Sequence, residues 1–284
     1  MIKIITDSTC DLSNELIQKY DIQVLPLYVN LGDESFRDKE DITVEQVYEW
    51  SDKHKTTPKT AAASIGEVME VLEPYKEAGD DVIIFSISES MSSINQNMRL
   101  AAQELEYEDH IFVIDSMNLS TGIGLQIIEA CEMAQKGMAA SDIADYINNL
   151  RPKVRSSFVI DTLVYLARGG RCSSVAALIG GVLNIKPKIV VEDGKMIVAK
   201  KYRGPYKKVI KQYVKEMEAD LLKARKDRVF ITHTPCDDGI VDGVRSYLEE
   251  LDYFDEILET NAGCTVGSHC GPNTLGVLFI AGDE

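Results

Sequence analysis

The chain has 284 residues, 45% of them hydrophobic and 27% charged, a composition that fits one large or two ordinary globular domains. Its formal net charge of −16 argues against binding to nucleic acid or to an anionic membrane, because both need clustered lysine and arginine. No apolar run reaches the ~18 residues of a membrane span and the N-terminus has no apolar signal core, so we expect a cytoplasmic protein without stable membrane insertion.

Strands and helices alternate through the first half of the chain. Short apolar runs rich in β-branched residues predict strands at 2–6, 22–29, 82–85 and 111–114. Apolar residues at helical spacing predict helices at 43–50, 65–73 and 119–136. This order predicts an α/β domain over residues 1–152, built on a Rossmann-like parallel sheet with helices on both of its faces.

Proline and capping residues set the ends of several of these elements. Pro26 places a break or an edge in the second strand. Ser64 and Glu67 have the spacing of a capping box, and Pro74 predicts the end of the helix that they begin. Residues 56–60, which lie before that helix, are predicted to form a loop.

Five serines lie between the strand at 82–85 and the helical pattern that follows it: Ser86, Ser88, Ser90, Ser92 and Ser93. A helix start offers unpaired N–H groups and the positive end of the helix dipole, so this loop could hold a carboxylate or a phosphate. Serine is also a preferred N-cap, and the same residues could do no more than cap the helix. Both interpretations stay open on the loop alone.

Polar residues follow two other strands of the predicted sheet. Asp7-Ser8 comes directly after the first strand, and Asp115-Ser116 comes directly after the strand at 111–114. In open α/β sheets, ligands bind beside the carboxyl ends of the strands. The sequence therefore predicts a ligand site at this edge of the sheet, next to the serine loop.

An α+β domain is predicted over residues 153–284. Its strands fall at 158–160, 229–232 and 277–280, and Asp193-Gly194 predicts a hairpin turn between 189–191 and 196–199. Its helices fall at 163–167, 174–183, 206–226 and 241–251. Residues 263–276 are predicted to form a glycine-rich loop that holds His269.

Three basic or titratable side chains in this second half are candidates for a site. Glycines on either side of His269 let the backbone approach a ligand, and the ring can hydrogen-bond a carboxylate or an acyl phosphate, although it could equally bond only its own loop. Arg171 and Arg203 are candidates for binding a phosphate or an acidic partner, because a guanidinium forms forked contacts with such groups. Each could also be an ordinary surface arginine.

The common sequence signatures of catalysis are absent. The chain has no G-x-S-x-G nucleophile elbow, no Walker A motif and no G-x-G-x-x-G motif. Cys264, His269 and Cys270 lie close together, but a zinc site needs about four ligands and the usual second pair is missing. We therefore expect binding rather than turnover, structural thiols, and no metal or other cofactor.

Seven short motifs occur in order along the chain: D-S-T-C-D-L at 7–12, T-A-A-A-S at 60–64, M-S-S-I-N at 91–95, G-G-R at 169–171, L-N-I-K-P at 183–187, R-G at 203–204 and H-C-G-P-N at 269–273. In this order they resemble the motifs of the DegV family of bacterial fatty-acid-binding proteins. The resemblance extends over nearly the whole chain.

This resemblance implies a protein that buries one long-chain fatty acid between its two domains. Thr60 and Ser92 would hold the carboxylate, Ser93 would lie beside them, and His269 would lie near the head group. Four more residues would support the site: Asp7, Ser8, Ser64 and Ser116.

The resemblance also implies a non-catalytic carrier. A separate ATP-dependent fatty acid kinase would phosphorylate the bound acid, and Arg171 and Arg203 would face that kinase. Two alternatives stay open. The chain could be a stand-alone phosphoryl- or acyl-transfer enzyme that uses Asp7, Asp115 and the serines, or a regulatory module that has lost lipid binding, since Ala61-Ala62-Ala63 replaces the family's Ser-Gln-Pro.

Overall fold

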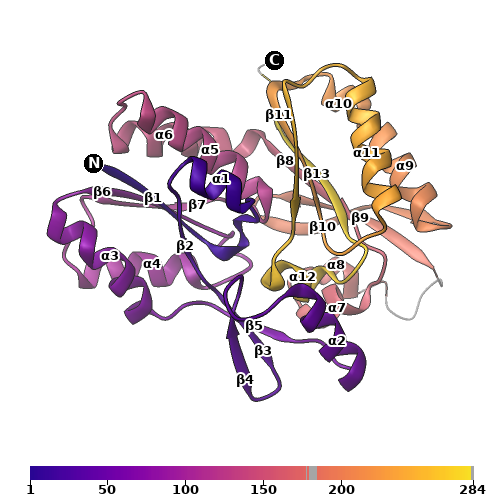
Figure 1. Ribbon diagram of the computed structural model, residues 1–284, viewed down its shortest axis with the longest axis horizontal. Coiled ribbons are helices and arrows are strands. Elements are labelled where there is room, and N and C mark those ends of the chain that lie inside the picture. Colours follow the sequence, from indigo (N-terminus) through magenta and orange to yellow (C-terminus); the bar gives the residue numbers. More distant parts are fainter. Residues whose placement is uncertain (177, 179–183, 283–284) are drawn as a thin grey trace.

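The computed structural model of the protein describes residues 1–176, 178 and 184–282. It contains a four-stranded sheet, a six-stranded sheet and a small three-stranded sheet. Figure 1 shows the first two side by side, with the small sheet and α2 (Val44–His54) beneath their junction. Among the described residues, no helix is both long and apolar enough to cross a lipid bilayer.

The four-stranded sheet is parallel, in the order β2 (Gln23–Leu25), β1 (Ile2–Asp7), β6 (Asp81–Ser86) and β7 (Ile111–Asp115). Successive side chains of a strand point to opposite faces, and both faces here are apolar. Ile5 and Ile84 pack against α3 (Ile65–Ala78) and α4 (Ile94–Glu104) on one face.

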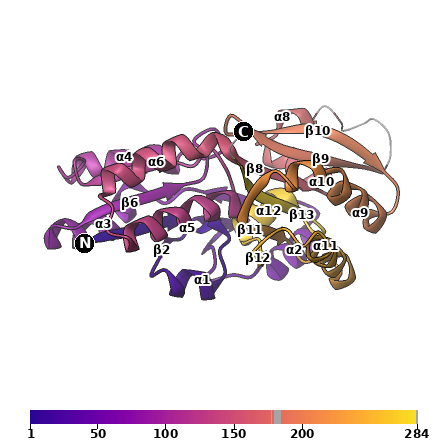
Figure 2. The same ribbon diagram turned by 90° about the horizontal axis from the view of Figure 1, so that it is seen from above.

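The other face of this sheet is covered by α5 (Thr121–Gln135) and α6 (Ala140–Leu150). Ile83 and Phe85 contribute the strand side chains, and α1 (Asn14–Lys19) lies at its edge, as Figures 1 and 2 show. The predicted α/β class, with a Rossmann-like parallel sheet flanked by helices on both faces, is confirmed.

Helix α5 lies between the two large sheets. Every residue from Thr121 to Cys131 is buried, because one side of the helix packs on β1 and β6 and the other on the second sheet, where Phe230 and Leu278 contact the same cluster. A helix that is apolar on all sides is expected where no face meets water. This shared helix joins the two sheets through a continuous core.

The second sheet is mixed, in the order β10 (Lys195–Arg203), β9 (Ile185–Glu192), β8 (Val154–Val159), β13 (Leu275–Ala281), β11 (Ala224–His233) and β12 (Glu256–Asn261). Its outer face is covered by α9 (Tyr206–Glu216), α10 (Glu218–Leu221) and α11 (Asp238–Glu250). The predicted hairpin turn at Asp193-Gly194 is present, with positive φ angles of 47° and 74°.

The small sheet has the order β4 (Glu34–Arg37), β3 (Tyr28–Leu31) and β5 (Lys59–Ala61). Near it lie three helices, α2, α7 (Val164–Gly169) and α12 (Cys264–Cys270), whose side chains share one apolar cluster with those of β3. Helix α12 therefore comes from the last part of the chain but packs against elements from the first part.

Three sequence predictions about secondary structure are wrong, because contacts with distant segments of the chain determine the structure at these places. Residues 59–61 are not loop, because they pair with β3 as strand β5. The helix predicted over 206–226 ends at Glu216, and β11 begins at Ala224 because the chain there pairs with β13. The glycine-rich loop predicted at 263–276 contains helix α12.

Two further predictions concern strand and helix limits. The strand predicted at 22–29 breaks at Pro26 as expected, and its two halves lie in different sheets as β2 and β3. The helix predicted at 174–183 begins as α8 (Ser173–Ala176), and most of its remainder lies outside the described residues.

Helix α3 continues through Pro74 and ends at Gly79. A proline in a helix removes one backbone hydrogen bond, but the helix here resumes and is closed by a Schellman-type end. Gly79 has φ of 70°, and the Asp80 N–H donates to the Tyr75 carbonyl at 2.9 Å. The prediction that Pro74 ends the helix is therefore wrong, and Gly79 sets its end.

Two glycines of this helix give a matched test. At Gly79 a Cβ would meet nothing within 4 Å, so Gly79→Ala should destabilise the protein by about 1 kcal/mol through its left-handed backbone alone. Gly66 also has open space but lies inside the helix, so Gly66→Ala should stabilise by roughly 0.5 kcal/mol. Urea unfolding followed by circular dichroism measures both, and two changes of the same sign would contradict the role assigned to Gly79.

Candidate functional site

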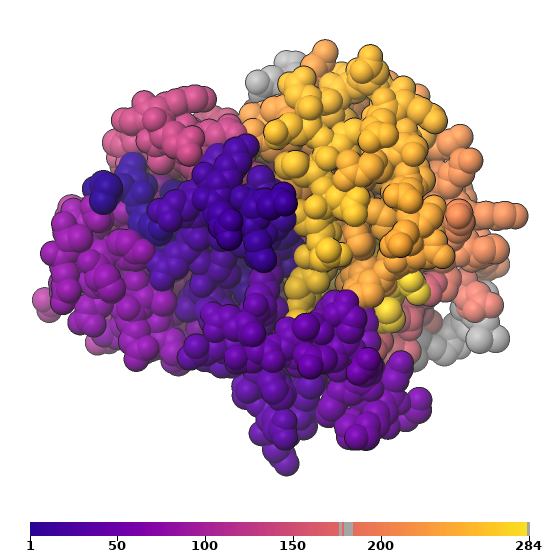
Figure 3. Space-filling model, viewed as in Figure 1, coloured from indigo at the N-terminus to yellow at the C-terminus, as the bar shows by residue number. Residues whose placement is uncertain are grey.

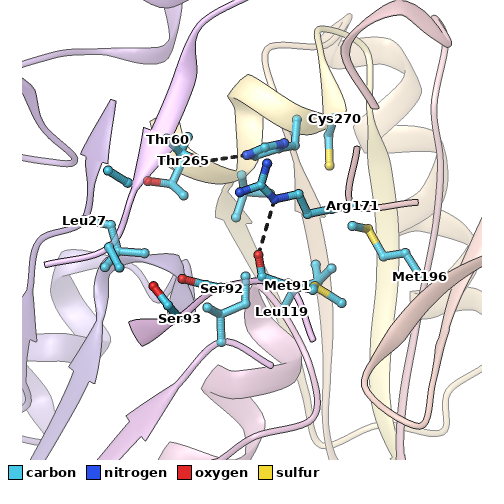
Figure 4. Close-up of a pocket in the computed structure, with 15 residues that line it drawn as sticks. Leu27, Thr60, Met91, Ser92, Ser93, Leu119, Arg171, Met196, Thr265 and Cys270 are labelled. Atoms are coloured by element: carbon cyan, nitrogen blue, oxygen red, sulfur yellow. Dashed lines mark hydrogen bonds between the residues drawn. The ribbon is translucent and has the colours of Figure 1, made fainter. Parts of the chain in front are cut away.

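A cavity of about 280 Å³ lies where the parallel sheet, the small sheet and the second sheet meet. Figure 4 shows its lining side chains, which come from both halves of the chain. The lining residues are Leu27, Thr60, Ala61, Ala62, Ile87, Met91, Ser92, Ser93, Leu119, Arg171, Met196, Thr265, Val266, His269 and Cys270. Figure 3 shows the surface of the two halves where they meet above the small sheet.

Thr60 and His269 meet in this cavity from opposite ends of the sequence. Thr60 is held in β5, paired with Val29 of β3, and His269 is in the last turn of α12. The Thr60 Oγ1 and His269 Nε2 atoms are hydrogen-bonded at 2.8 Å. Two of the four residues that the family resemblance places around a carboxylate are therefore in direct contact.

The N-terminus of α12 is held by two buried carboxylates from the first part of the chain. Asp38 accepts hydrogen bonds from the backbone N–H groups of Cys264 at 2.8 Å and Thr265 at 3.1 Å. Asp11 accepts one from the N–H of Gly263 at 2.8 Å. These bonds satisfy helix N–H groups that would otherwise lack partners, and they fix the helix that carries His269.

Close packing fixes the His269 ring as well. A Cβ at Gly169 would lie 2.3 Å from the His269 Nδ1 atom, so only glycine fits there. Nδ1 itself is buried and has no hydrogen-bond partner among the described residues. Burial, aided by the positive charge of Arg171, lowers the pKa of His269 from 6.5 to about 4. The imidazole is therefore neutral at physiological pH.

The serine loop ends at the cavity, and its serines have different partners. Ser93 is the N-cap of α4 but its side chain makes no capping hydrogen bond, whereas Ser92 Oγ accepts from the Ile94 N–H at 3.3 Å. Ser88 and Ser90 bond each other at 3.0 Å away from the cavity. Ser92 and Ser93 are the two serines of this loop that line the cavity.

Arg171 lines the same cavity from the turn after α7. Its guanidinium donates to the Gly169 carbonyl at 2.7 Å and to the Met91 carbonyl at 3.3 Å, the second of which Figure 4 marks. Arg171 is also exposed to solvent. Arg203, at the end of β10, does not line the cavity.

The four residues expected to support the site do not line it. Asp7 accepts from the Ile87 N–H at 2.7 Å and joins the ends of β1 and β6. Ser8 donates to Asp38 at 3.0 Å. Ser64 caps α3 at the surface, and Ser116 donates to the Asn118 carbonyl at 3.3 Å. Their observed contacts stabilise the surrounding loops.

Several lining residues were not identified by sequence reasoning. Thr265 is buried, and its hydroxyl has no hydrogen-bond partner among the described residues. Met91, Leu119 and Met196 form the apolar part of the wall. Such residues look like ordinary core positions in a sequence, and only the folding of α12 against β5 brings Thr265 to the cavity.

The chemistry of the cavity suits the binding of an anion with an apolar part. Hydroxyl groups, a neutral imidazole and one guanidinium line the cavity together with aliphatic and thioether groups. Neither Ser92 nor Ser93 is hydrogen-bonded to a histidine that could act as a base. Among the described residues, no group of three or more histidine, cysteine, aspartate or glutamate side chains could hold a metal ion.

Comparison with known proteins gives consistent matches over the full length. A family model described as "Uncharacterised protein, DegV family" matches residues 1–282. A DegV domain-containing protein from Clostridium perfringens is 37% identical over 279 residues, which cover 98% of each chain.

Solved structures match equally well. A DegV family protein from Thermus thermophilus, whose structure is described by its fatty acid binding, superimposes with a TM-score of 0.91 at 29% identity, over 99% of each chain. A stearic-acid-binding protein from Eubacterium ventriosum has a TM-score of 0.84 at 28% identity, over 99% of this chain and 98% of that one.

The pKa of His269 predicts a loss of stability in mild acid. Between pH about 6.5 and pH about 4 the unfolded chain binds a proton at this histidine that the folded chain does not, so the contribution of His269 to the free energy of unfolding should fall as the pH falls through that window. His269→Gln should flatten this fall, and the control His54→Gln, at an exposed position, should keep it. Urea unfolding at several pH values measures the slopes, and equal slopes in both variants would contradict the assignment.

Proposed function

The chain belongs to the DegV family, and we propose that it binds a long-chain fatty acid in the cavity between its sheets and presents the carboxylate to a separate fatty acid kinase. The observation that carries this proposal is the hydrogen bond between Thr60 and His269 in a cavity that Ser92 and several apolar side chains also line. The relatives described as fatty-acid- and stearic-acid-binding proteins share this fold over nearly their full length.

The carboxylate would be held by hydrogen bonds from hydroxyl groups. Thr60 and Ser92 are the primary donors, and Ser93 lines the same cavity. A hydrogen bond to an ionised carboxylate is stronger than one between neutral groups. Thr60 has one hydroxyl proton, so for Thr60 to donate to the carboxylate the neutral His269 would donate its Nε2–H to Thr60 Oγ1, without adding charge.

The acyl chain would lie against the apolar wall. Each buried methylene contributes about 0.8 kcal/mol, so a long chain can supply most of the affinity even after the cost of ordering it. Leu119, Val266 and Cys270 line the head-group cavity and also a narrower one of about 20 Å³, which extends it toward β13. The hydroxyl groups would then determine the orientation of the acid more than its affinity.

We also propose that the two halves of the chain bind different parts of the fatty acid, as the sequence suggested. Residues 1–152 supply Thr60, Ser92 and Ser93 for the head group, and residues 153–284 supply Met196 and Cys270 for the chain. The division is not strict, because His269 of the second range bonds Thr60, and Met91 and Leu119 of the first range belong to the apolar wall. No cofactor is part of this proposal, and the carrier itself is non-catalytic.

Arg171 is the group best placed to meet the kinase. It is partly exposed at the mouth of the cavity, and with Met196 it also borders a surface hollow lined by Gly169, Gly170 and Lys195. A guanidinium there can stabilise the charge of an acyl phosphate as it forms. Arg203 lines neither of these cavities. In this proposal it would act only by contacting the surface of the kinase directly.

Native mass spectrometry of gently purified protein should detect one bound long-chain fatty acid. Ser92→Ala should bind the acid about tenfold more weakly, because one hydrogen bond to a charged group is lost. Ser35→Ala, at an exposed position of β4, is the matched control and should bind normally. Wild-type protein that neither carries nor takes up a fatty acid would refute the proposal.

Arg171→Ala should separate binding from kinase use. Lipid content should stay near that of the wild type, while the rate of acyl phosphate formation by a cognate kinase should fall at least about tenfold. Arg168→Ala, in the same basic turn but outside the cavity, is the control and should retain both properties. Equal loss of lipid and of kinase use in Arg171→Ala would show that the residue serves only the head group.

A further inference from the structure

Ser120 holds a backbone conformation that serine rarely adopts. It immediately precedes the first residue of α5 and has φ of 53° and ψ of −143°. This combination lies close to a region that is populated almost only by glycine, because a Cβ there crowds the backbone. The turn that leads into α5 is therefore strained at a serine, where glycine would relieve the strain.

The hydroxyl of Ser120 gives a reason for a serine at this strained position. Its Oγ atom donates a hydrogen bond to Asp11 Oδ2 at 2.5 Å. Ser120 is 4% exposed and Asp11 is 0% exposed, so water does not compete for this bond. Strained residues persist where the surrounding structure holds them, and they are concentrated at functional sites. The side chain of Ser120 is thus used at the expense of its backbone.

Asp11 joins the starts of two helices that border the head-group cavity. Its Oδ2 atom accepts from Ser120, the neighbour of Leu119 in the cavity wall. Its Oδ1 atom accepts from the N–H of Gly263 at 2.8 Å, at the N-cap of α12, which carries His269. One carboxylate therefore fixes parts of the wall that come from both halves of the chain.

Two glycines let Asp11 approach both helices. A Cβ at Gly124 of α5 would lie 2.6 Å from Leu12 Cδ2 and 3.3 Å from the Cys10 carbonyl oxygen, so the turn that contains Asp11 packs directly on this helix. A Cβ at Gly263 would lie 3.3 Å from Asp11 Oδ1. The close approach on both sides requires glycine, because a larger residue would push the carboxylate away from its two donors.

The charge of Asp11 is balanced between burial and its neighbours. Burial raises the pKa of this carboxyl to about 7, and the negative charge of Asp38 acts in the same direction. The positive charge of Lys39 and the hydrogen bonds from Ser120 and Gly263 oppose the rise.

Two buried thiols also face Asp11, that of Cys10 in its own turn and that of Cys270 in α12. Burial raises the pKa of both thiols above the ordinary cysteine value, so they are neutral at physiological pH. Asp11 therefore gains or loses its charge near neutral pH while these two neighbours keep theirs unchanged.

We propose that Asp11 is a positioning residue of the fatty acid site that acts in its ionised form, fixing Leu119 through Ser120 and fixing α12 through Gly263. This inference rests on the proposed function, because it concerns the affinity for a fatty acid. A hydrogen bond to a charged acceptor is roughly twice as strong as one between neutral groups. Neutral Asp11 therefore holds both helix starts less firmly, and fatty acid binding weakens.

Asp11→Asn tests the role of the charge, because asparagine has the size of aspartate without its charge. The delipidated full chain is titrated with stearic acid at pH 8 and pH 6, and each variant is compared with the wild type at the same pH. We expect Asp11→Asn to bind about tenfold more weakly than the wild type at pH 8. At pH 6 the two should bind nearly equally, because Asp11 of the wild type is then mostly neutral.

Asp145→Asn is the matched control, since it makes the same change at an exposed position of α6 and should bind as the wild type does at both pH values. A loss of affinity in Asp11→Asn that is equal at pH 8 and pH 6, or no loss at pH 8, would overturn the proposal.

Two variants of Ser120 separate binding from folding. Ser120→Ala and Ser120→Gly both lose the hydroxyl, but only glycine relieves the backbone, so Ser120→Gly should have the higher melting temperature of the two. Both should bind stearic acid about tenfold more weakly than the wild type at pH 8. Wild-type affinity in Ser120→Gly would show that the hydroxyl has no part in binding.

Hydrogen exchange separates a failure of this inference from a failure of the lipid proposal. Without fatty acid at pH 8, the amides of residues 263–270 should lose protection in Asp11→Asn and keep it in Asp145→Asn. A wild type that binds no stearic acid, together with this loss of protection, refutes the lipid proposal and leaves the attachment of α12 by Asp11 supported. Unchanged protection in Asp11→Asn would overturn the inference whatever the lipid result.

Discussion

The functional geometry depends on the attachment of helix α12 to the first part of the chain. At its N-terminus, Asp38 accepts hydrogen bonds from the backbone N–H groups of Cys264 and Thr265, and Asp11 accepts one from that of Gly263. The helix has seven residues, which is too short to be stable by itself. Its position, and with it the position of His269, is therefore determined by these contacts and by its packing on α2 and α7.

Burying carboxylates has a cost that the surrounding donors offset. Asp38 is 1% exposed and also accepts from the Ser8 hydroxyl, so each of its oxygens has a partner. Burial raises the pKa of Asp11 to about 7, against the opposing effects of the Lys39 charge and of hydrogen bonds from Ser120 and Gly263. Carboxylates thus replace water at a helix end that the packing has closed off from solvent.

Sequence reasoning succeeded where local patterns determine structure and failed where distant segments pair. Strands β1, β6 and β7 were predicted from short apolar runs, and their carboxyl ends carry the polar residues that were expected there. β5 and α12 were predicted as loops, because their strand and helix forms depend on pairing with β3 and on capping by Asp38. Thr60 and His269 could be named from a family resemblance, but their contact across 209 positions has no local signature.

The serine loop shows why neither half of the chain can complete the site alone. Ser90 donates to the Gly194 carbonyl at 2.5 Å, and a Cβ at Gly194 would lie 2.6 Å from Ser88 Oγ, so the β9–β10 turn packs closely on this loop. Arg171 holds the same loop through the Met91 carbonyl. The loop that offers Ser92 is therefore positioned by two elements of the second half, just as His269 is positioned by carboxylates of the first. Head-group geometry consequently depends on the docking of the two large sheets, and a change at their interface alters the site without touching any residue that lines it.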